Sequence, residues 1–120
     1  MKKILIVDDE PNIVMALEYT FKKNNFEVFI ARDGQEALEI LEKQLPDVII
    51  LDVMMPMVDG YATIEEIKKD ERLAHCKVIF LSAKNKESDI EKGMALGADA
   101  YLTKPFSIKK VVDQVMELLS

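Results

Sequence analysis

The chain has 120 residues, 49% of them hydrophobic and 32% charged, a balance typical of one globular domain with its own core. Its net charge of −6 argues against nucleic-acid binding by this domain alone, because a phosphate backbone requires a basic surface. No apolar run approaches the roughly 20 residues that a membrane-spanning helix needs, so we expect one cytoplasmic domain over residues 1–120 without a membrane partner.

Short apolar runs alternate with amphipathic stretches five times, a pattern typical of βαβ units and a parallel sheet. The predicted strands are residues 3–7, 27–31, 48–51, 78–81 and 100–103. The first, third and fourth are continuously apolar, as expected of strands that helices cover on both faces. The second alternates more and therefore suits an edge of the sheet.

Helical spacing and capping residues predict a helix after each strand. The first begins near Pro11, which suits a first-turn position, and ends at about Asn24. The second opens at the capping residue Asp33. Its expected core-facing residues are Ala37, Leu38, Leu41 and Leu45.

The third helix follows Asp59 and Gly60. Its expected core-facing residues are Ala62, Ile64 and Ile67. The fourth runs from about Lys86 to Leu96 and ends at Gly97. Ser107 caps the fifth, whose apolar stripe is Ile108, Val111, Val112, Val115 and Leu119. With right-handed crossovers, five such units predict a doubly wound α/β sandwich.

Cys76 and His75 are the only cysteine and the only histidine of the chain. A single thiol excludes an internal disulfide and favours a reducing compartment. A single histidine excludes a metal cluster built from histidines. We interpret Cys76 as a half-buried residue leading into a strand and His75 as a solvated loop residue.

Charged and hydroxyl residues stand where four of the apolar runs end. Asp8 and Asp9 follow the first run, Asp52 the third, Ser82 the fourth and Lys104 the fifth. Because the carboxyl ends of parallel strands meet at one sheet edge, where open α/β sheets bind ligands, we expect these side chains to converge. Two unit charges about 4 Å apart repel by roughly 4 kcal/mol at an effective dielectric near 20, so the acids favour a divalent cation such as Mg²⁺.

A cation and a hydroxyl beside such a site suit the oxygens of a phosphoryl group. Asp52 is then a candidate nucleophile that forms an aspartyl phosphate. Taken singly, each residue also has a plain structural interpretation. The acids can cap a helix or occupy a turn, Lys104 can be a surface cation and Ser82 a cap.

Four segments carry a resemblance to a known family. Residues 4–10 (ILIVDDE), 49–56 (IILDVMMP) with Asp59-Gly60, 80–83 (FLSA) and 97–106 (GADAYLTKPF) resemble the CheY-like receiver domain of two-component response regulators. The resemblance covers essentially the whole chain. It implies a flavodoxin-like, doubly wound sheet of five parallel strands in the order 2-1-3-4-5 with five helices.

The resemblance also implies roles for individual residues. Asp52 would be the phosphoacceptor, and Mg²⁺ would be bound by Asp8, Asp9 and Asp52 together with the backbone carbonyl of Met54. An apolar Met54 offers no hydrogen-bond acceptor to an attacking water, which predicts slow self-dephosphorylation.

Three more residues would complete the switch. Lys104 would contact the phosphoryl group, Ser82 would be the switch hydroxyl, and Tyr101 would be the aromatic that turns inward on activation. In this family the Lys104-Pro105 peptide is typically cis.

The function that the resemblance implies is a phosphorylation-dependent signalling switch, which catalyses only its own phosphorylation and dephosphorylation. A sensor histidine kinase or a phosphotransfer protein would be the partner, and the surface of the fourth helix, fifth strand and fifth helix would change. A homodimer through that surface is a further expectation, although the last helix lacks the arginines that acid–arginine pairs require. We expect either a free-standing receiver or the regulatory part of a longer protein.

A Mg²⁺-dependent phosphohydrolase with an Asp nucleophile is the nearest alternative. Haloacid-dehalogenase-like enzymes place a second acid two residues after the nucleophile, but Met54 stands there after Asp52 and Glu10 after Asp8. A nucleotide-binding fold is disfavoured because residues 8–12 contain no glycine to admit a pyrophosphate. An unphosphorylated docking module leaves the acids and Lys104 unexplained.

Overall fold

The computed structural model describes residues 1–55 and 59–120 and contains a sheet of five parallel strands in the order β2-β1-β3-β4-β5. The strands are β1 (Lys3–Val7), β2 (Glu27–Ala31), β3 (Val48–Leu51), β4 (Lys77–Ser82) and β5 (Ala100–Thr103). The predicted order is confirmed, and β2 lies at an edge as its alternating pattern indicated. Only β4 differs from its predicted bounds, by one residue at each end.

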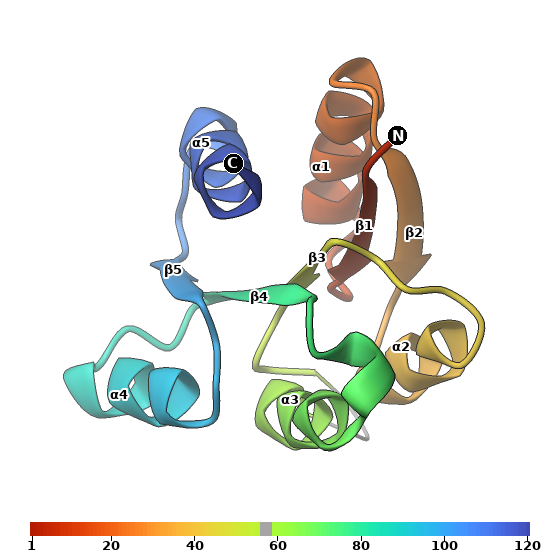
Figure 1. The fold of residues 1–120 in the computed structure, drawn as a ribbon. Helices are drawn as coiled ribbons and strands as arrows, with labels where there is room; N and C mark the ends of the chain where they lie inside the picture. The colour runs from red at the N-terminus through yellow and green to blue at the C-terminus, as the bar shows by residue number, and fades with distance from the viewer. Residues whose placement is uncertain (56–58) are drawn as a thin grey trace.

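Helices cover both faces of this sheet, as Figure 1 shows. One layer holds α1 (Pro11–Lys23) and α5 (Ile108–Leu119), and the other holds α2 (Gly34–Leu41), α3 (Gly60–Lys69) and α4 (Glu87–Ala95). A short 3₁₀ helix, η1 (Glu71–Leu73), follows α3. Two hydrophobic clusters fill the spaces between the sheet and these two layers.

The residues of β3 explain why this strand is apolar throughout. Ile49 and Leu51 belong to the cluster under α2 and α3, whereas Val48 and Ile50 belong to the cluster under α1 and α5. All four are at most 1% exposed. Each such side chain contributes about 1.5–3 kcal/mol on burial, so a strand between two layers needs apolar residues at every position.

The predicted caps Asp33 and Ser107 are confirmed, and Asp59 caps α3 in the same way. Asp33, Asp59 and Ser107 each accept a hydrogen bond from the backbone N–H three residues later, at 2.8, 2.8 and 3.1 Å. Gly97 follows α4 with φ +111°, a backbone conformation that favours glycine. These bonds fix where α2, α3 and α5 begin relative to the strands before them.

Two predicted core positions are wrong. Leu45 is 43% exposed because α2 ends at Leu41, and Pro46 disfavours helical backbone at the residue before it. On α3, Thr63 faces the core in place of Ala62. The Thr63 hydroxyl donates to the carbonyl of Asp59 at 2.7 Å, and this hydrogen bond offsets the cost of burying the hydroxyl.

Cys76 is fully buried instead of half-buried, and its thiol lies 2.7 Å from the carbonyl of Pro46. Burial raises the pKa of this thiol to about 11. His75 is exposed, as predicted. Among the helices of the described residues, none has the length and apolarity needed to cross a membrane.

Candidate functional site

The register between β1 and β3 determines where the first two acids of the site lie. Val7 lies opposite Leu51, so the next residues, Asp8 and Asp52, leave the sheet at the same level. The backbone N–H of Asp52 still donates to the carbonyl of Val7 at 2.9 Å, which holds the two chain segments together. Asp8 is 1% exposed and Asp52 is 3% exposed. The sheet thus places two carboxylates side by side at its carboxyl edge.

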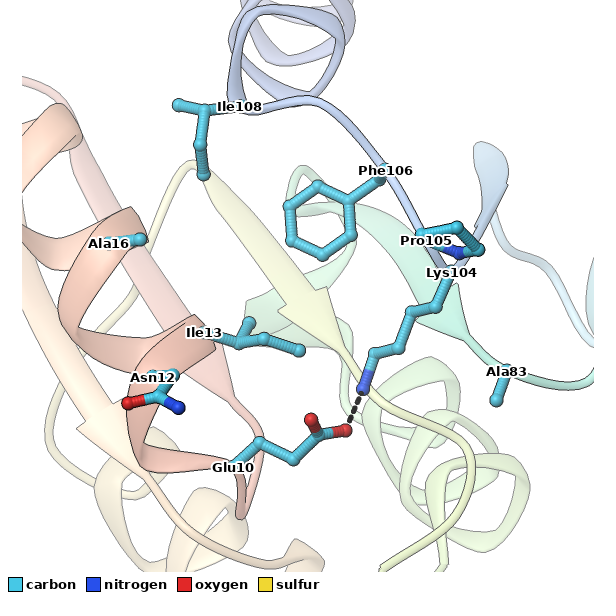
Figure 2. A pocket seen from close by; sticks show the side chains of 9 residues that line it. All are labelled: Glu10, Asn12, Ile13, Ala16, Ala83, Lys104, Pro105, Phe106 and Ile108. Carbon is cyan, nitrogen blue, oxygen red and sulfur yellow. Dashed lines mark hydrogen bonds and ion pairs between the residues drawn. The ribbon is translucent and has the colours of Figure 1, made fainter.

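Lys104 brings a cation to these acids from the loop after β5. Its Nζ lies 2.8 Å from Glu10 Oε1, 3.2 Å from Asp8 Oδ2 and 3.5 Å from Asp52 Oδ2. Figure 2 shows the side chain reaching toward Glu10 at the start of α1. The carboxylates of Asp52, Glu10 and Asp8 therefore meet at the Lys104 ammonium group, although they lie 52, 94 and 96 positions from it in sequence. The positions of the strand ends predicted this meeting for Asp8 and Asp52.

The charges are only partly compensated. Burial, followed by the charge of Asp8, raises the pKa of Asp52 to about 6, although Lys104 acts in the opposite direction. Burial also raises the pKa of Asp8. Burial would lower the pKa of Lys104, but the hydrogen bond to Glu10 and the two buried carboxylates together raise it. At neutral pH Asp52 is therefore mostly ionised, and an additional cation stabilises this form.

Asp8, Glu10 and Asp52 each offer an oxygen within 4.8 Å of the other two. Hard carboxylate oxygens, two of them from buried residues, suit a hard divalent cation such as Mg²⁺. The acidic cluster is thus compatible with magnesium. Glu10 was not among the predicted ligands, although it continues the acidic run of Asp8 and Asp9 and this position was the available signal.

Not every predicted ligand belongs to this group. Asp9 is exposed and stands outside the three-residue group. Met54 is 56% exposed, and its backbone N–H donates to Asp52 Oδ1 at 3.2 Å. Their roles in metal binding remain predictions.

Ser82 and Tyr101 are both tied to Lys84. Ser82 is fully buried and its Oγ accepts the N–H of Lys84 at 3.1 Å. The Tyr101 hydroxyl donates to the carbonyl of Lys84 at 2.9 Å, and its ring packs against Phe80. The Tyr101 ring thus already packs on Phe80 of the neighbouring strand. Ser82 fixes the backbone of Lys84, which follows β4.

Glycine is required where α3 approaches Asp52. A Cβ at Gly60 would lie 2.7 Å from Cα of Val53 and still closer to the carbonyl oxygen of Asp52. The N–H of Gly60 donates to the carbonyl of Val53 at 2.9 Å. The missing side chain therefore lets the start of α3 pack directly on the backbone at Asp52.

A groove of about 580 Å³ lies beside Lys104, between α1 and the loop before α5 (Figure 2). Glu10 and Lys104 line its polar end. Its other lining is mostly apolar and includes Ile13, Ala16, Pro105, Phe106 and Ile108. The Lys104-Pro105 peptide at its rim is cis, as the resemblance implied.

The geometry agrees with a comparison to known families. The family model described as the response regulator receiver domain matches residues 4–116. The chain belongs to this family. Receiver domains are signalling domains of two-component systems and not classical enzymes.

Known receiver proteins resemble the chain in sequence. It is 42% identical over 118 residues to the alkaline phosphatase synthesis transcriptional regulatory protein PhoP of Bacillus subtilis. That match covers 98% of this chain and 48% of PhoP, so this receiver domain spans about half the length of its curated relative.

Solved structures resemble the receiver domain in fold. The Francisella response regulator 1452 receiver domain is 35% identical with a TM-score of 0.90, and the match covers 98% of this chain and 96% of that one. The chemotaxis response regulator CheY4 of Vibrio cholerae is 30% identical with a TM-score of 0.92 over 98% of each chain. The CheY-like flavodoxin fold is thereby confirmed.

Proposed function

We propose that the chain is a switch in which Asp52 accepts a phosphoryl group from a partner histidine kinase or phosphotransfer protein. The single observation that carries this proposal is the meeting of Asp52, Asp8 and Lys104 at the sheet edge, with Lys104 Nζ 3.5 Å from Asp52 Oδ2. A carboxylate beside a cation and further acids is the arrangement that phosphoryl transfer to Asp requires. The same proposal places the domain in the cytoplasm.

The transfer step follows from the residues. A carboxylate oxygen of Asp52 forms the new bond to phosphorus while the bond from phosphorus to the donor atom breaks, and the donor keeps that electron pair. Lys104 is positioned to neutralise the oxygens of the incoming group. Asp8, Asp9, Asp52 and the Met54 carbonyl are the proposed Mg²⁺ ligands. When bound, Mg²⁺ would supply charge neutralisation at the phosphoryl oxygens.

The signal would leave the site through Ser82, Lys104 and Tyr101. Phosphorylation adds negative charge and acceptor oxygens at Asp52, which attract Lys104 away from Glu10 and draw the Ser82 hydroxyl. Movement of Ser82 shifts the chain that Tyr101 contacts at Lys84. The populations of two packings of α4, β5 and α5 then change.

We place the phosphodonor's docking site over the apolar groove of Figure 2, because Lys104 lines the polar end of this groove. An apolar helix face fits a groove lined by aliphatic and aromatic side chains. A homodimer through α4, β5 and α5 would not draw arginines for acid–arginine pairs from α5, because this helix contains none.

Acetyl phosphate with Mg²⁺ tests the proposal directly. We expect intact-mass measurement to detect one added phosphoryl group per wild-type chain and none on Asp52→Ala. A phosphohydrolase would instead turn over a phosphate monoester many times, which we do not expect. Equal labelling of the wild type and of Asp52→Ala would refute the assignment.

A further inference from the structure

Two tyrosine hydroxyls hold the segment between β4 and α4 at its two ends. Tyr101 of β5 donates to the carbonyl of Lys84 at 2.9 Å, and Tyr61 of α3 donates to the carbonyl of Asp89 at 3.1 Å. Lys84 lies in the loop before α4, and Asp89 lies in its first turn. The two bonds therefore bracket residues 84–89 from different elements.

Both tyrosine rings rest on the same buried ring. Tyr61 packs edge-on against Phe80 with centroids 5.6 Å apart, and Tyr101 packs tilted against Phe80 at 5.7 Å. Phe80 is fully buried in the cluster under α3. Because such interiors are closely packed, a shift of one tyrosine changes the space available to the other through this ring.

Tyr61 is fixed in the role of a hydrogen-bond donor. It is 8% exposed, and the Nζ of Lys92 lies 4.5 Å from its ring centroid. Burial raises the pKa of Tyr61 to about 12. Its hydroxyl therefore keeps its proton at neutral pH and remains a donor to Asp89.

The helix held in this way lies unusually close to the rings. A Cβ at Gly93 of α4 would stand 3.0 Å from ring carbons of both Phe80 and Tyr101. The absent side chain lets the α4 backbone pack directly on the aromatic rings. A change in how α4 begins is therefore transmitted to Tyr101 without an intervening side chain.

We propose that Tyr61 is a positioning residue of the switch, whose hydroxyl holds the first turn of α4 where the Tyr101 hydroxyl can reach Lys84. The two hydroxyls act as one clamp on residues 84–89. The clamp is present in the unphosphorylated chain, and its use as part of the switch rests on the proposed function. The role assigned to Tyr61 is to bias the inward packing of Tyr101 and not to touch the phosphoryl group.

Hydrogen exchange of the full chain tests the clamp. Tyr61→Phe keeps the ring and removes only the hydroxyl, so we expect amides of residues 84–89 to exchange about fivefold faster, the loss of one ordinary hydrogen bond. Amides of the central strands keep their wild-type rates. Tyr19→Phe, a change at an exposed residue of α1, is the matched control and alters neither set. Unchanged exchange over 84–89, or an equal rise across the sheet, overturns the proposal.

Beryllofluoride with Mg²⁺, a phosphoryl mimic, tests the connection to the switch. We expect the mimic to slow exchange over 84–89 in the wild type and to do so at least threefold less in Tyr61→Phe, with Tyr101→Phe showing the same loss. Labelling of Asp52 by acetyl phosphate stays within twofold in Tyr61→Phe. Equal protection by the mimic in wild type and variant refutes the switch role. Absence of labelling at Asp52 would instead refute the proposed function and leave the clamp test standing.

Discussion

The amino ends and the carboxyl ends of the strands both carry aspartates, in different surroundings. At the amino ends, Asp47 accepts the backbone N–H of Lys3 at 2.8 Å. Asp99 likewise accepts the N–H of Val78 at 2.8 Å. Each carboxylate is only half-buried and pairs with a donor at the start of a strand. These acids stabilise the sheet.

At the carboxyl ends, Asp8 and Asp52 also accept backbone N–H groups, those of Glu10 and Met54. The difference is that both carboxylates are buried beside each other and share a single ammonium group, that of Lys104. Aspartate therefore stabilises one end of the sheet and destabilises the other, depending on burial and on the neighbouring charge.

Removal of the shared cation should have the largest effect. We expect Lys104→Met to lower the free energy of unfolding by about 3–5 kcal/mol without Mg²⁺, because two buried carboxylates lose their partner. Urea denaturation at pH 7 measures this change, and Mg²⁺ should restore part of the loss. Lys109→Met, which breaks an exposed ion pair with Asp113, should change little. Similar losses in both variants would show that the buried carboxylates do not depend on Lys104.

Neutralising Asp52, the proposed phosphoacceptor, should stabilise the metal-free protein. The folded-state pKa of Asp52 is about 6 against an ordinary 3.8, so the folded state binds more protons between these values and its stability falls as pH rises through them. At pH 7 we expect Asp52→Asn to be about 2–3 kcal/mol more stable than wild type. Thermal unfolding at pH 7 and pH 3.5 should show the gain at pH 7 only. A gain independent of pH would count against this explanation.

At the amino ends the sign reverses. Asp99→Ala leaves the N–H of Val78 without its acceptor and should cost about 1–2 kcal/mol. The loss should be independent of Mg²⁺. Asp99→Asn is the matched control, because its side-chain oxygen can still accept the bond. Chemical denaturation of both variants checks the prediction, and a stabilised Asp99→Ala would show that this carboxylate does not stabilise the sheet.

The smallest effect on stability should be at Asp9. The acidic cluster by itself suggests that Asp9→Asn raises the melting temperature of the metal-free protein, but Asp9 is exposed and outside the group of close carboxylates. We expect a change below about 0.5 kcal/mol. As a proposed ligand, Asp9 should still affect Mg²⁺ affinity, by about tenfold in calorimetric titration. A stability gain as large as that expected of Asp52→Asn would show that Asp9 shares the buried charge.

The sequence was sufficient for the sheet and for the meeting of Asp8, Asp52 and Lys104, because both depend on where apolar runs end. Asp8, Asp52 and Lys104 each follow a strand, so topology alone brings them to one edge. The part played by Glu10 was missed because it depends on the turn from β1 into α1. The burial of Thr63 was missed because it depends on a local hydrogen bond that a hydrophobic pattern does not encode.

Gly60 has a consequence for anyone who transfers this site to another scaffold. With the α3 backbone packed directly on the chain at Asp52, main-chain contact helps to set the depth of the Asp52 carboxylate. Copying the acids and the lysine alone would reproduce the charged groups of the pocket but not the backbone packing beneath Asp52. The minimal transferable unit therefore includes a residue that contributes no functional group at all.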